Sequence, residues 1–300
     1  MAKPLAGSIA VVAGATRGAG RAIAVELGAA GALVYCTGRT TRTHRSDLGR
    51  EESIEETAEL VSSRGGVGIA VQVDHTNEDE VCALFERVRA EQDGRLDILV
   101  NDVWGGDMLM QNLPFWEMSL DKGLLMMQRG FLSHVITSRY GAPLMVARKS
   151  GLIVELTDGV SSAYRGELFY DLTKASVNRL AFGMAEELRP HGVTALALTP
   201  GFLRSEAMLD HFGVTEANWQ DGAQRDPHFI ASETPYFVAR ALVALATDPK
   251  VAQKSGGAYS SWELSDEYGF SDIDGRRPHW GRYFAEHVMG KALEDTTASS

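Results

Sequence analysis

The stretch that decides the fold is Ile9–Gly20, with the sequence IAVVAGATRGAG. It begins with five apolar residues, passes through a loop with three glycines (Gly14, Gly18 and Gly20), and leads into the helical segment Arg21–Ala30. Glycines at such a turn let the backbone approach a ligand closely, and the start of the helix offers N–H groups to a pyrophosphate. A glycine loop between a buried strand and a helix predicts a dinucleotide site, although a purely structural turn is the alternative.

The same alternation continues along the chain to about residue 260. Short apolar runs are each followed by a segment with helical periodicity or by a polar loop. The runs are Ile9–Ala13, Leu33–Cys36, Gly68–Val73, Leu96–Val100, Leu152–Leu156 and Val193–Leu198. Strands that are apolar on both faces are typical of a parallel sheet covered by helices on both sides. The sequence therefore predicts an α/β fold with a doubly wound, Rossmann-like parallel sheet, in a single domain over residues 1–281.

The segment Asn77–Gln92 carries the clearest helix signals. It opens with Asn-Glu-Asp-Glu, and Gly94 stands just beyond its end. Its apolar residues recur at helical spacing and form one stripe. The stripe consists of Val81, Leu84, Phe85 and Val88.

The composition excludes several classes of function. The chain has 29 Lys and Arg against 40 Asp and Glu, and the net charge of -11 opposes non-specific binding to nucleic acid or anionic membranes. No apolar run approaches about 18 residues, and the first residues lack signal-peptide features. We therefore expect a cytoplasmic protein with neither a membrane nor a nucleic-acid partner. Cys36 and Cys82 lack metal-ligand spacing and are expected as small core residues, and the scattered histidines predict no metal centre.

The residues that follow the glycine loop favour NADP(H) over NAD(H). NAD-binding folds place an acid about twenty residues after the loop, where it holds the ribose 2′-hydroxyl. Here that position reads Gly38-Arg39, and Arg17 already lies in the loop. Arginine attracts a 2′-phosphate, whereas an acid would repel it. Three more arginines in the loop Thr40–Arg50 either strengthen this pocket or form a solvated basic surface.

A tyrosine and a lysine stand four residues apart at the start of a later helix. Tyr170 and Lys174 lie in the sequence YDLTK, which heads a helical segment reaching Arg189, so that the two side chains share one helix face. A nearby ammonium favours the phenolate, and we expect it to lower the pKa of Tyr170 towards neutrality. Such a tyrosine can donate a proton to a forming alkoxide or accept one from an alcohol. Alone, the pair is common on protein surfaces.

Taken together, these motifs resemble the short-chain dehydrogenase/reductase family over about the first 260 residues. The matching residues, in order, are the three loop glycines, Asp74 after the third strand, Asn101 after the fourth, the Tyr170–Lys174 pair, and Pro200-Gly201 after the sixth strand. Beyond them, Phe115-Trp116-Glu117, Ala246-Thr-Asp-Pro249 and Asp274-Gly-Arg276 are similar to the subgroup that contains dehydrogenase/reductase member 1.

The resemblance implies a role for each matching residue. Asp74 becomes the adenine contact, and Ser205 takes the place of a threonine near the nicotinamide carboxamide. Asp74 can also be a turn residue, and Ser205 can be a helix N-cap before Glu206. The full expected cofactor site consists of Gly14, Thr16, Arg17, Gly18, Gly20, Arg39, Asp74, Asn101, Tyr170, Lys174, Pro200, Gly201 and Ser205.

The family's serine, which donates a hydrogen bond to the substrate oxygen, is missing here. Asp158 takes its position after the fifth strand, Thr157 precedes it, and Ser161 and Ser162 lie further along. An ionised Asp158 only accepts hydrogen bonds, repels a developing alkoxide and raises the pKa of Tyr170. Four interpretations stay open: burial keeps Asp158 protonated, Thr157 is the donor, the substrate carries a cation that pairs with Asp158, or Asp158 only caps a turn.

Two further positions depart from the family pattern. The Asn-Asn-Ala-Gly that follows the fourth strand reads Asn101-Asp102-Val103-Trp104-Gly105, and Gln128 replaces the helix asparagine of the proton relay. A glutamine can still hold the relay water from a longer side chain. Trp104 replaces a glycine beside the expected nicotinamide site, where it either narrows the pocket or fills the core.

The C-terminal third is expected to carry the elements that select the substrate. Family members have a variable lid that corresponds to about residues 205–231, and the apolar and aromatic residues there favour a hydrophobic substrate, with simple packing as the alternative. A tail, 282–300, is expected to fray at its last residues. Trp262, Trp280 and Tyr283 cover either the pocket or a neighbouring subunit.

These observations predict an NADPH-dependent oxidoreductase of the carbonyl reductase or alcohol dehydrogenase type, acting on a small, hydrophobic ketone, aldehyde or alcohol. Tyr170 protonates the oxygen, Lys174 tunes the tyrosine, Gln128 relays protons through water, and Thr157 or Asp158 orients the substrate. The alternative is an NADP(H)-binding sensor or scaffold without redox turnover. The resemblance also implies a homodimer or a homotetramer.

Overall fold

The fold is built on one parallel sheet. The computed structural model describes residues 3–45, 49–160 and 163–289. Within these residues the sheet has seven strands in the order β3-β2-β1-β4-β5-β6-β7. The strands are β1 (Ile9–Ala13), β2 (Leu33–Gly38), β3 (Val67–Gln72), β4 (Ile98–Asn101), β5 (Gly151–Leu156), β6 (Val193–Thr199) and β7 (Ala258–Ser260). The first six confirm the predicted strands to within two residues at each end, whereas β7 is too short to carry an apolar run.

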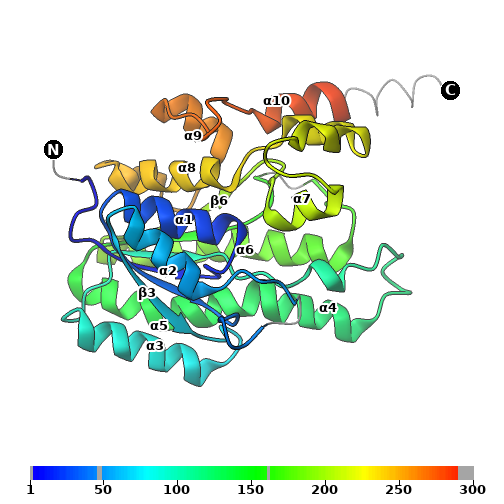
Figure 1. Ribbon diagram of the computed structural model, residues 1–300. Helices are drawn as coiled ribbons and strands as arrows, with labels where there is room; N and C mark the ends of the chain where they lie inside the picture. Colours follow the sequence, from blue (N-terminus) through cyan, green and yellow to red (C-terminus); the bar gives the residue numbers. More distant parts are fainter. Residues whose placement is uncertain (1–2, 46–48, 161–162, 290–300) are drawn as a thin grey trace.

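Helices cover both faces of the sheet, as the sequence predicts. Figure 1 shows α1, α2 and α8 on one face and α3 and α5 on the other. The helices of the described residues are α1 (Gly18–Ala29), α2 (Ile54–Ser63), α3 (Glu78–Glu91), α4 (Leu120–Met127), α5 (Ser133–Arg148), α6 (Leu168–Leu188), α7 (Glu206–Phe212), α8 (Pro235–Thr247), α9 (Ser261–Tyr268) and α10 (Trp280–Phe284). Strands β1, β4 and β6 are buried along their whole length, so that they send apolar side chains to both faces of the sheet. Each face therefore has its own apolar core.

Local signals account for the helix boundaries. The Asn77 side chain caps α3 by accepting hydrogen bonds from the N–H groups of Asp79 and Glu80, and the predicted apolar stripe is buried. In contrast, α1 begins at Gly18, three residues before the expected Arg21. The loop before α1 is therefore shorter than the sequence suggests. Two of the three motif glycines, Gly18 and Gly20, lie in the first turn of the helix.

The topology places a crevice where the chain reverses its direction along the sheet. Strand β1 lies between β2 and β4, so the connections after β1 and β4 leave in opposite directions. In doubly wound sheets, ligands bind beyond the carboxyl ends of the strands at this point. The loops after β1, β4, β5 and β6 meet there.

The C-terminal region folds back over the loop that follows β6. The Trp280 ring lies edge-on to Phe202 and stacks on Tyr283, so part of the predicted tail is ordered against the molecule. The last residues, for which fraying is expected, lie outside the described part of the chain. None of the helices in the described ranges combines the length and apolar character needed to span a bilayer.

A test of the packing uses the glycine on the edge strand β3. A Cβ on Gly68 would collide with the Ala58 carbonyl oxygen of α2, so that two backbones would have to separate. We expect Gly68→Ala to lower the free energy of unfolding by about 2 kcal/mol in urea denaturation. The control is Gly183→Ala in α6, where a Cβ meets open space and helix propensity predicts a gain of up to about 1 kcal/mol. An unchanged midpoint for Gly68→Ala would contradict this packing.

Candidate active site

Tyr170 and Asp158 are in direct contact at the carboxyl edge of the sheet. Tyr170 lies in the first turn of α6, and Asp158 follows β5 by two residues. The Tyr170 hydroxyl donates a hydrogen bond of 2.7 Å to Oδ2 of Asp158. Asp158 therefore faces the tyrosine, and its carboxylate does more than cap a turn.

The contact changes the acidity of the tyrosine. Burial raises the pKa of Tyr170 well above its ordinary value, and the charge of Asp158 and its hydrogen bond raise it further. Arg165 acts in the opposite direction, but its effect is smaller. The expected lowering of the pKa towards neutrality is not seen, because burial and the Asp158 carboxylate both raise the pKa of the phenol.

The ammonium of Lys174 is held by an aromatic ring. Its Nζ lies 4.2 Å from the centre of the Trp104 ring and 5.8 Å from that of Tyr170. The Trp104 ring meets Tyr170 edge-on at 5.6 Å, and its Nε1 donates to Oδ1 of Asp107 at 2.7 Å. Trp104 is thus part of the candidate site and does not merely fill the core. Burial lowers the pKa of Lys174, while Asp158 and Asp102 oppose that shift.

Two residues expected to assist Tyr170 point elsewhere. The Thr157 hydroxyl donates at 3.0 Å to the backbone carbonyl of Lys174, and its side chain is 4% exposed. Its proton is engaged by the helix backbone, which does not favour the interpretation that Thr157 is the substrate donor. Gln128 is exposed at the start of the π-helix η2 (Gln128–Leu132), which does not favour the expected relay. The alternatives Ser161 and Ser162 lie outside the described residues.

A buried polar network fixes the end of β4. The Asn101 amide donates to the Ser138 hydroxyl at 2.8 Å and to Glu155 at 2.7 Å. The other carboxylate oxygen of Glu155 contacts Nδ1 of His134 at 2.7 Å, and Nε2 of His134 lies 2.9 Å from the Val103 carbonyl. Asn101 is thus turned into the core, and the network holds the backbone just before Trp104. A glutamate inside the apolar run LIVEL is the only sequence signal of it.

The glycine loop packs tightly against the exit of β4. A Cβ on Gly14 would lie 2.5 Å from the Asp102 carbonyl oxygen, and one on Gly20 would lie 2.8 Å from Oδ2 of Asp102. Burial raises the pKa of Asp102 to about 7, against the opposing effects of Lys174 and the Gly20 N–H. These two glycines are therefore required for the close approach of the two strand ends.

A carboxylate occupies the N-terminus of α1. The N–H of Gly18, which has φ of +56°, donates to Oε2 of Glu206 at 2.9 Å. Glu206 belongs to α7 in the predicted lid, and Ser205 caps that helix by accepting from the Met208 N–H at 3.4 Å. Ser205 therefore takes the N-cap alternative. A carboxylate of the protein itself thus accepts a hydrogen bond where the glycine loop predicts the pyrophosphate.

The arginines expected to hold a 2′-phosphate are paired with acids. Arg17 Nε lies 3.9 Å from Glu52, which also contacts Arg50 at 2.8 Å, and Arg50 reaches Asp210 of α7 at 2.7 Å. The basic loop and the lid are therefore joined by ion pairs. Thr16 is buried beneath Gly38, where a Cβ would lie 2.6 Å from its hydroxyl oxygen.

The remaining cofactor candidates make mostly local contacts. Asp74 accepts hydrogen bonds from the N–H and hydroxyl of Thr76 at 2.9 and 2.7 Å, and Arg39 lies 4.0 Å from Asp74. Asp74 thus adopts the turn alternative. The Gly201 N–H, after Pro200, donates to Glu233 at 3.0 Å, and burial raises the pKa of Glu233 to about 8.

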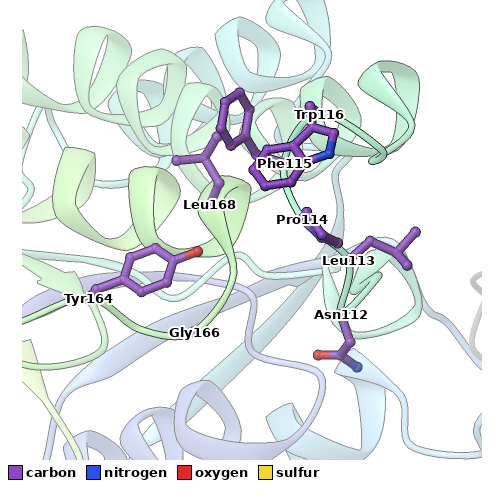
Figure 2. A pocket seen from close by; sticks show the side chains of 8 residues that line it. All are labelled: Asn112, Leu113, Pro114, Phe115, Trp116, Tyr164, Gly166 and Leu168. Carbon is purple, nitrogen blue, oxygen red and sulfur yellow. The ribbon is translucent and has the colours of Figure 1, made fainter.

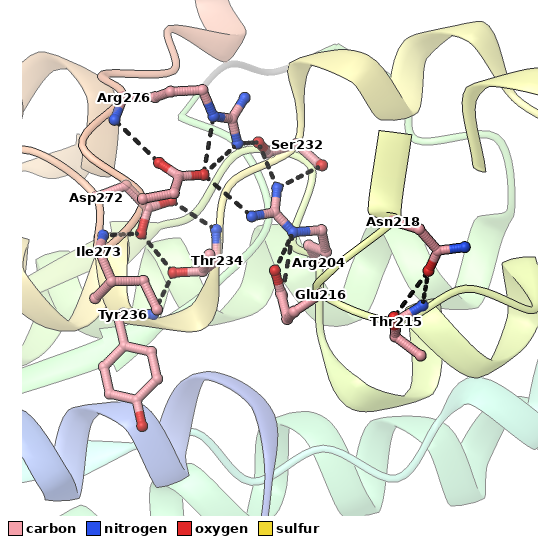
Figure 3. A network of polar contacts seen from close by, with 11 residues as sticks. Arg204, Thr215, Glu216, Asn218, Ser232, Thr234, Tyr236, Asp272, Ile273 and Arg276 are labelled. Atoms are coloured by element: carbon pink, nitrogen blue, oxygen red, sulfur yellow. Dashed lines mark hydrogen bonds and ion pairs between the residues drawn. The ribbon is translucent and has the colours of Figure 1, made fainter. Parts of the chain in front are cut away.

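An arginine buried in the lid region anchors it to the C-terminal segment. Arg204 is 1% exposed, stacks on the Trp219 ring at 4.1 Å, and binds Glu216 and Asp274 at 3.0 and 3.2 Å. Figure 3 shows Glu216 beside the Arg204 guanidinium. Arg276 also pairs with Asp274, at 2.8 Å. The sequence offers no signal for this network, because its partners come from segments far apart in the chain.

An open cavity of about 610 Å³ lies between the loops after β4 and β5. These are the loops that carry Trp104 and Asp158. Figure 2 shows Tyr164 and Leu168 on one side of the cavity, facing Phe115 and Leu113 on the other. Its lining is Asn112, Leu113, Pro114, Phe115, Trp116, Tyr164, Gly166 and Leu168.

Known proteins are similar to this chain in sequence and in fold. The family model described as short chain dehydrogenase matches residues 8–212. The human protein dehydrogenase/reductase SDR family member 1 is 38% identical over 281 residues, which cover 92% of this chain and 86% of that protein. A 3-oxoacyl-(acyl-carrier-protein) reductase of Staphylococcus aureus is 31% identical over 66% of this chain and 75% of its own.

Solved structures agree with the sequence matches. A short-chain dehydrogenase of Mycobacterium thermoresistibile superposes with a TM-score of 0.77 at 23% identity, with 92% of each chain covered. A protein of Beutenbergia cavernae, assigned as an NAD(P)-dependent gluconate 5-dehydrogenase and solved with NADP at low occupancy, gives 0.68 at 25% identity. That match covers 87% of this chain and 97% of the other.

The anchoring role of Arg204 can be tested by replacement. Arg204→Met removes a buried cation from facing carboxylates, and we expect the free energy of unfolding to fall by about 3 kcal/mol. Urea denaturation measures this loss, and limited proteolysis should show faster cleavage within residues 205–231. The control is Arg225→Met, an exposed lid arginine that donates to the His211 carbonyl, with an expected loss below about 1 kcal/mol. Equal losses in both variants would refute the anchor.

Proposed function

Since this chain belongs to the short-chain dehydrogenase/reductase family, we propose that it is an NADPH-dependent oxidoreductase of the carbonyl reductase type. The observation that carries the proposal is the Tyr170–Lys174 pair at the head of α6, beside the crevice that begins at the N-terminus of α1. Because α6 follows β5 and α1 follows β1, both groups lie at the carboxyl edge of the sheet, where ligands bind in such folds.

The N-terminus of α1 fits the pyrophosphate of a dinucleotide. The carboxylate of Glu206 stands in for an anion there, on the Gly18 N–H. Helix N-termini of glycine loops bind phosphate through such N–H groups. In the proposed complex, the pyrophosphate replaces Glu206, and the lid helix α7 must move with it.

The preference for NADP(H) over NAD(H) rests on charge. Position 38–39 reads Gly-Arg where an acid would select NAD(H), and Arg17 and Arg50 lie close together beside the glycine loop. Their acidic partner, Glu52, partly neutralises them, so a 2′-phosphate would compete with its carboxylate. The Beutenbergia cavernae structure with NADP supports the same choice.

The proposed mechanism is a reduction. When bound, NADPH supplies a hydride to the carbonyl carbon. Tyr170 then donates its proton to the oxygen, and its raised pKa keeps it protonated near neutral pH. A base for alcohol oxidation would need the phenolate, which the same shift disfavours. Lys174 places a positive charge near the phenol. Its ammonium lies closer to the Trp104 ring, at 4.2 Å, than to the Tyr170 ring, at 5.8 Å.

A second candidate function is NADP(H) binding without redox turnover. The observation in its favour is that Asp158 already accepts a hydrogen bond of 2.7 Å from the Tyr170 hydroxyl. A neutral carbonyl would have to compete with a carboxylate for that proton. The protein would then act as a sensor or scaffold.

The proposed substrate is small and hydrophobic, and the proposed protein is a cytoplasmic homo-oligomer. Aromatic and aliphatic side chains line the cavity between the two site loops, which suits an apolar substrate. Apolar side chains on α4 and α6 are also exposed, which supports pairing of two copies through these helices. They are Leu120, Leu124, Leu172 and Phe182.

The redox proposal predicts a specific loss in Tyr170→Phe. Without the phenol there is no positioned acid, so NADPH oxidation followed at 340 nm should fall by at least about a hundredfold across a carbonyl panel. NADPH binding, followed by its fluorescence, should change little. The control is Tyr140→Phe, which removes a hydroxyl on α5 that donates to Glu78 of α3. This variant should keep full activity. Tight NADPH binding with no wild-type turnover would select the sensor or scaffold instead.

If Glu206 occupies the place of the pyrophosphate, removing its charge should increase the affinity for NADPH. Glu206→Gln removes a charge that competes for the Gly18 N–H, and a charge-assisted hydrogen bond contributes about 1.5 to 3 kcal/mol. We expect the Kd for NADPH to fall by roughly tenfold in a fluorescence titration. Glu187→Gln, an exposed carboxylate on α6, changes the same net charge and should leave the Kd unchanged. Weaker binding by Glu206→Gln would contradict the competition.

A further inference from the structure

Two carboxylates and two cations lie near Tyr170, and the group that contacts its hydroxyl is a carboxylate. Asp158 contacts the phenol directly, and Asp107 also raises the pKa of Tyr170. The nearby cations are both engaged: Lys174 lies on Trp104, and Arg165 pairs with Asp171 at 3.1 Å and donates to the Asp158 backbone carbonyl. A substrate oxygen that gained negative charge here would face a carboxylate.

We infer that the natural substrate is a protonated imine, that is, an iminium cation. Its N–H would donate a hydrogen bond to the Asp158 carboxylate, beside Tyr170. This inference rests on the proposed function, because it keeps the same cofactor and the same hydride transfer. It changes the group reduced, from C=O to C=N, and with that change Tyr170 orients Asp158 and no longer supplies a proton. An acceptor-only carboxylate at the family's serine position suits a donor on the substrate, and an iminium N–H is such a donor.

Reduction of an iminium avoids placing a negatively charged alkoxide next to the Asp158 carboxylate. The iminium carbon accepts a hydride from NADPH, and the π electron pair of the C=N bond becomes the lone pair of the nitrogen. The products are a neutral amine and NADP⁺, so no proton has to leave Tyr170. The hydrogen bond between Tyr170 and Asp158 can then persist through the reaction and orient the carboxylate. Charge at the substrate falls from positive to neutral, and no alkoxide forms next to Asp158.

The neighbouring cavity suits the rest of such a substrate. Three aromatic side chains line it, those of Phe115, Trp116 and Tyr164, together with aliphatic ones. Aromatic faces attract organic cations as well as apolar groups. Tyr170 and Asp158 do not line the cavity, but the same two loops that carry Trp104 and Asp158 form it, and we assign to it the part of the substrate remote from the C=N bond.

A matched substrate pair tests the inference. NADPH oxidation is followed with dihydroisoquinoline, a cyclic imine that is protonated near neutral pH, and with α-tetralone, a ketone of similar size and shape. We expect kcat/KM to be at least about tenfold higher for the imine, since hydrogen bonds between charged groups give discrimination of this order. A higher kcat/KM for the ketone would overturn the inference and leave the proposed function intact.

Variants of Asp158 provide the second readout. In Asp158→Asn, kcat/KM for the imine should fall between about tenfold and about a hundredfold, and in Asp158→Ser the preference should move to the ketone. Asp121→Asn, which removes an exposed carboxylate at the start of α4, should keep the wild-type ratio of imine to ketone. An unchanged ratio in both Asp158 variants would overturn the inference.

Binding separates a failure of this inference from a failure of the proposed function. If neither substrate is reduced, the NADP⁺-loaded protein is titrated calorimetrically with tetrahydroisoquinoline, a cationic amine, and with the neutral alcohol tetralol. Tighter binding of the amine, weakened at least about tenfold in Asp158→Asn, would support a cation site and contradict only redox turnover. No preference for the amine would overturn the inference as well.

Discussion

The close contact between the glycine loop and the end of β4 is the constraint on which the candidate site depends. Side chains at Gly14 or Gly20 would collide with Asp102 or with the loop itself, so only glycine lets the two strand ends meet. This contact closes the crevice between β1 and β4. It also brings the cofactor side, at α1, next to the catalytic side, at Trp104 and α6.

Around this contact, the polar groups pair with the nearest partners that the fold supplies and not with those that sequence spacing suggests. Lys174 was expected to act on Tyr170, but the flat face of Trp104 offers its ammonium a nearer partner. Asp158 then becomes the group that governs the phenol. Trp104 and Asp158 are therefore the nearest partners of the two groups, and the Tyr170–Lys174 spacing alone does not reveal this.

The sequence predicts the fold well because its signals are local. Six strands, the capped helix α3 and the glycine loop each follow from short patterns of apolar residues, caps and turns. The site is predicted less well because its contacts join distant segments. Thr157 and Asp158 are adjacent, and only the direction of each side chain shows that one serves the helix backbone and the other faces Tyr170.

The same limit applies to the lid. The partner of Gly18 is Glu206, 188 positions along the chain, and the buried Arg204 draws its carboxylates from two other segments. No periodicity or motif encodes such pairings. In the proposed NADPH complex, Glu206 would be a competitor tethered to the protein, at a high effective concentration that dilution does not change. A tethered competitor raises the cofactor concentration needed for half-saturation, so the occupancy of the enzyme would track the cellular cofactor pool instead of staying saturated.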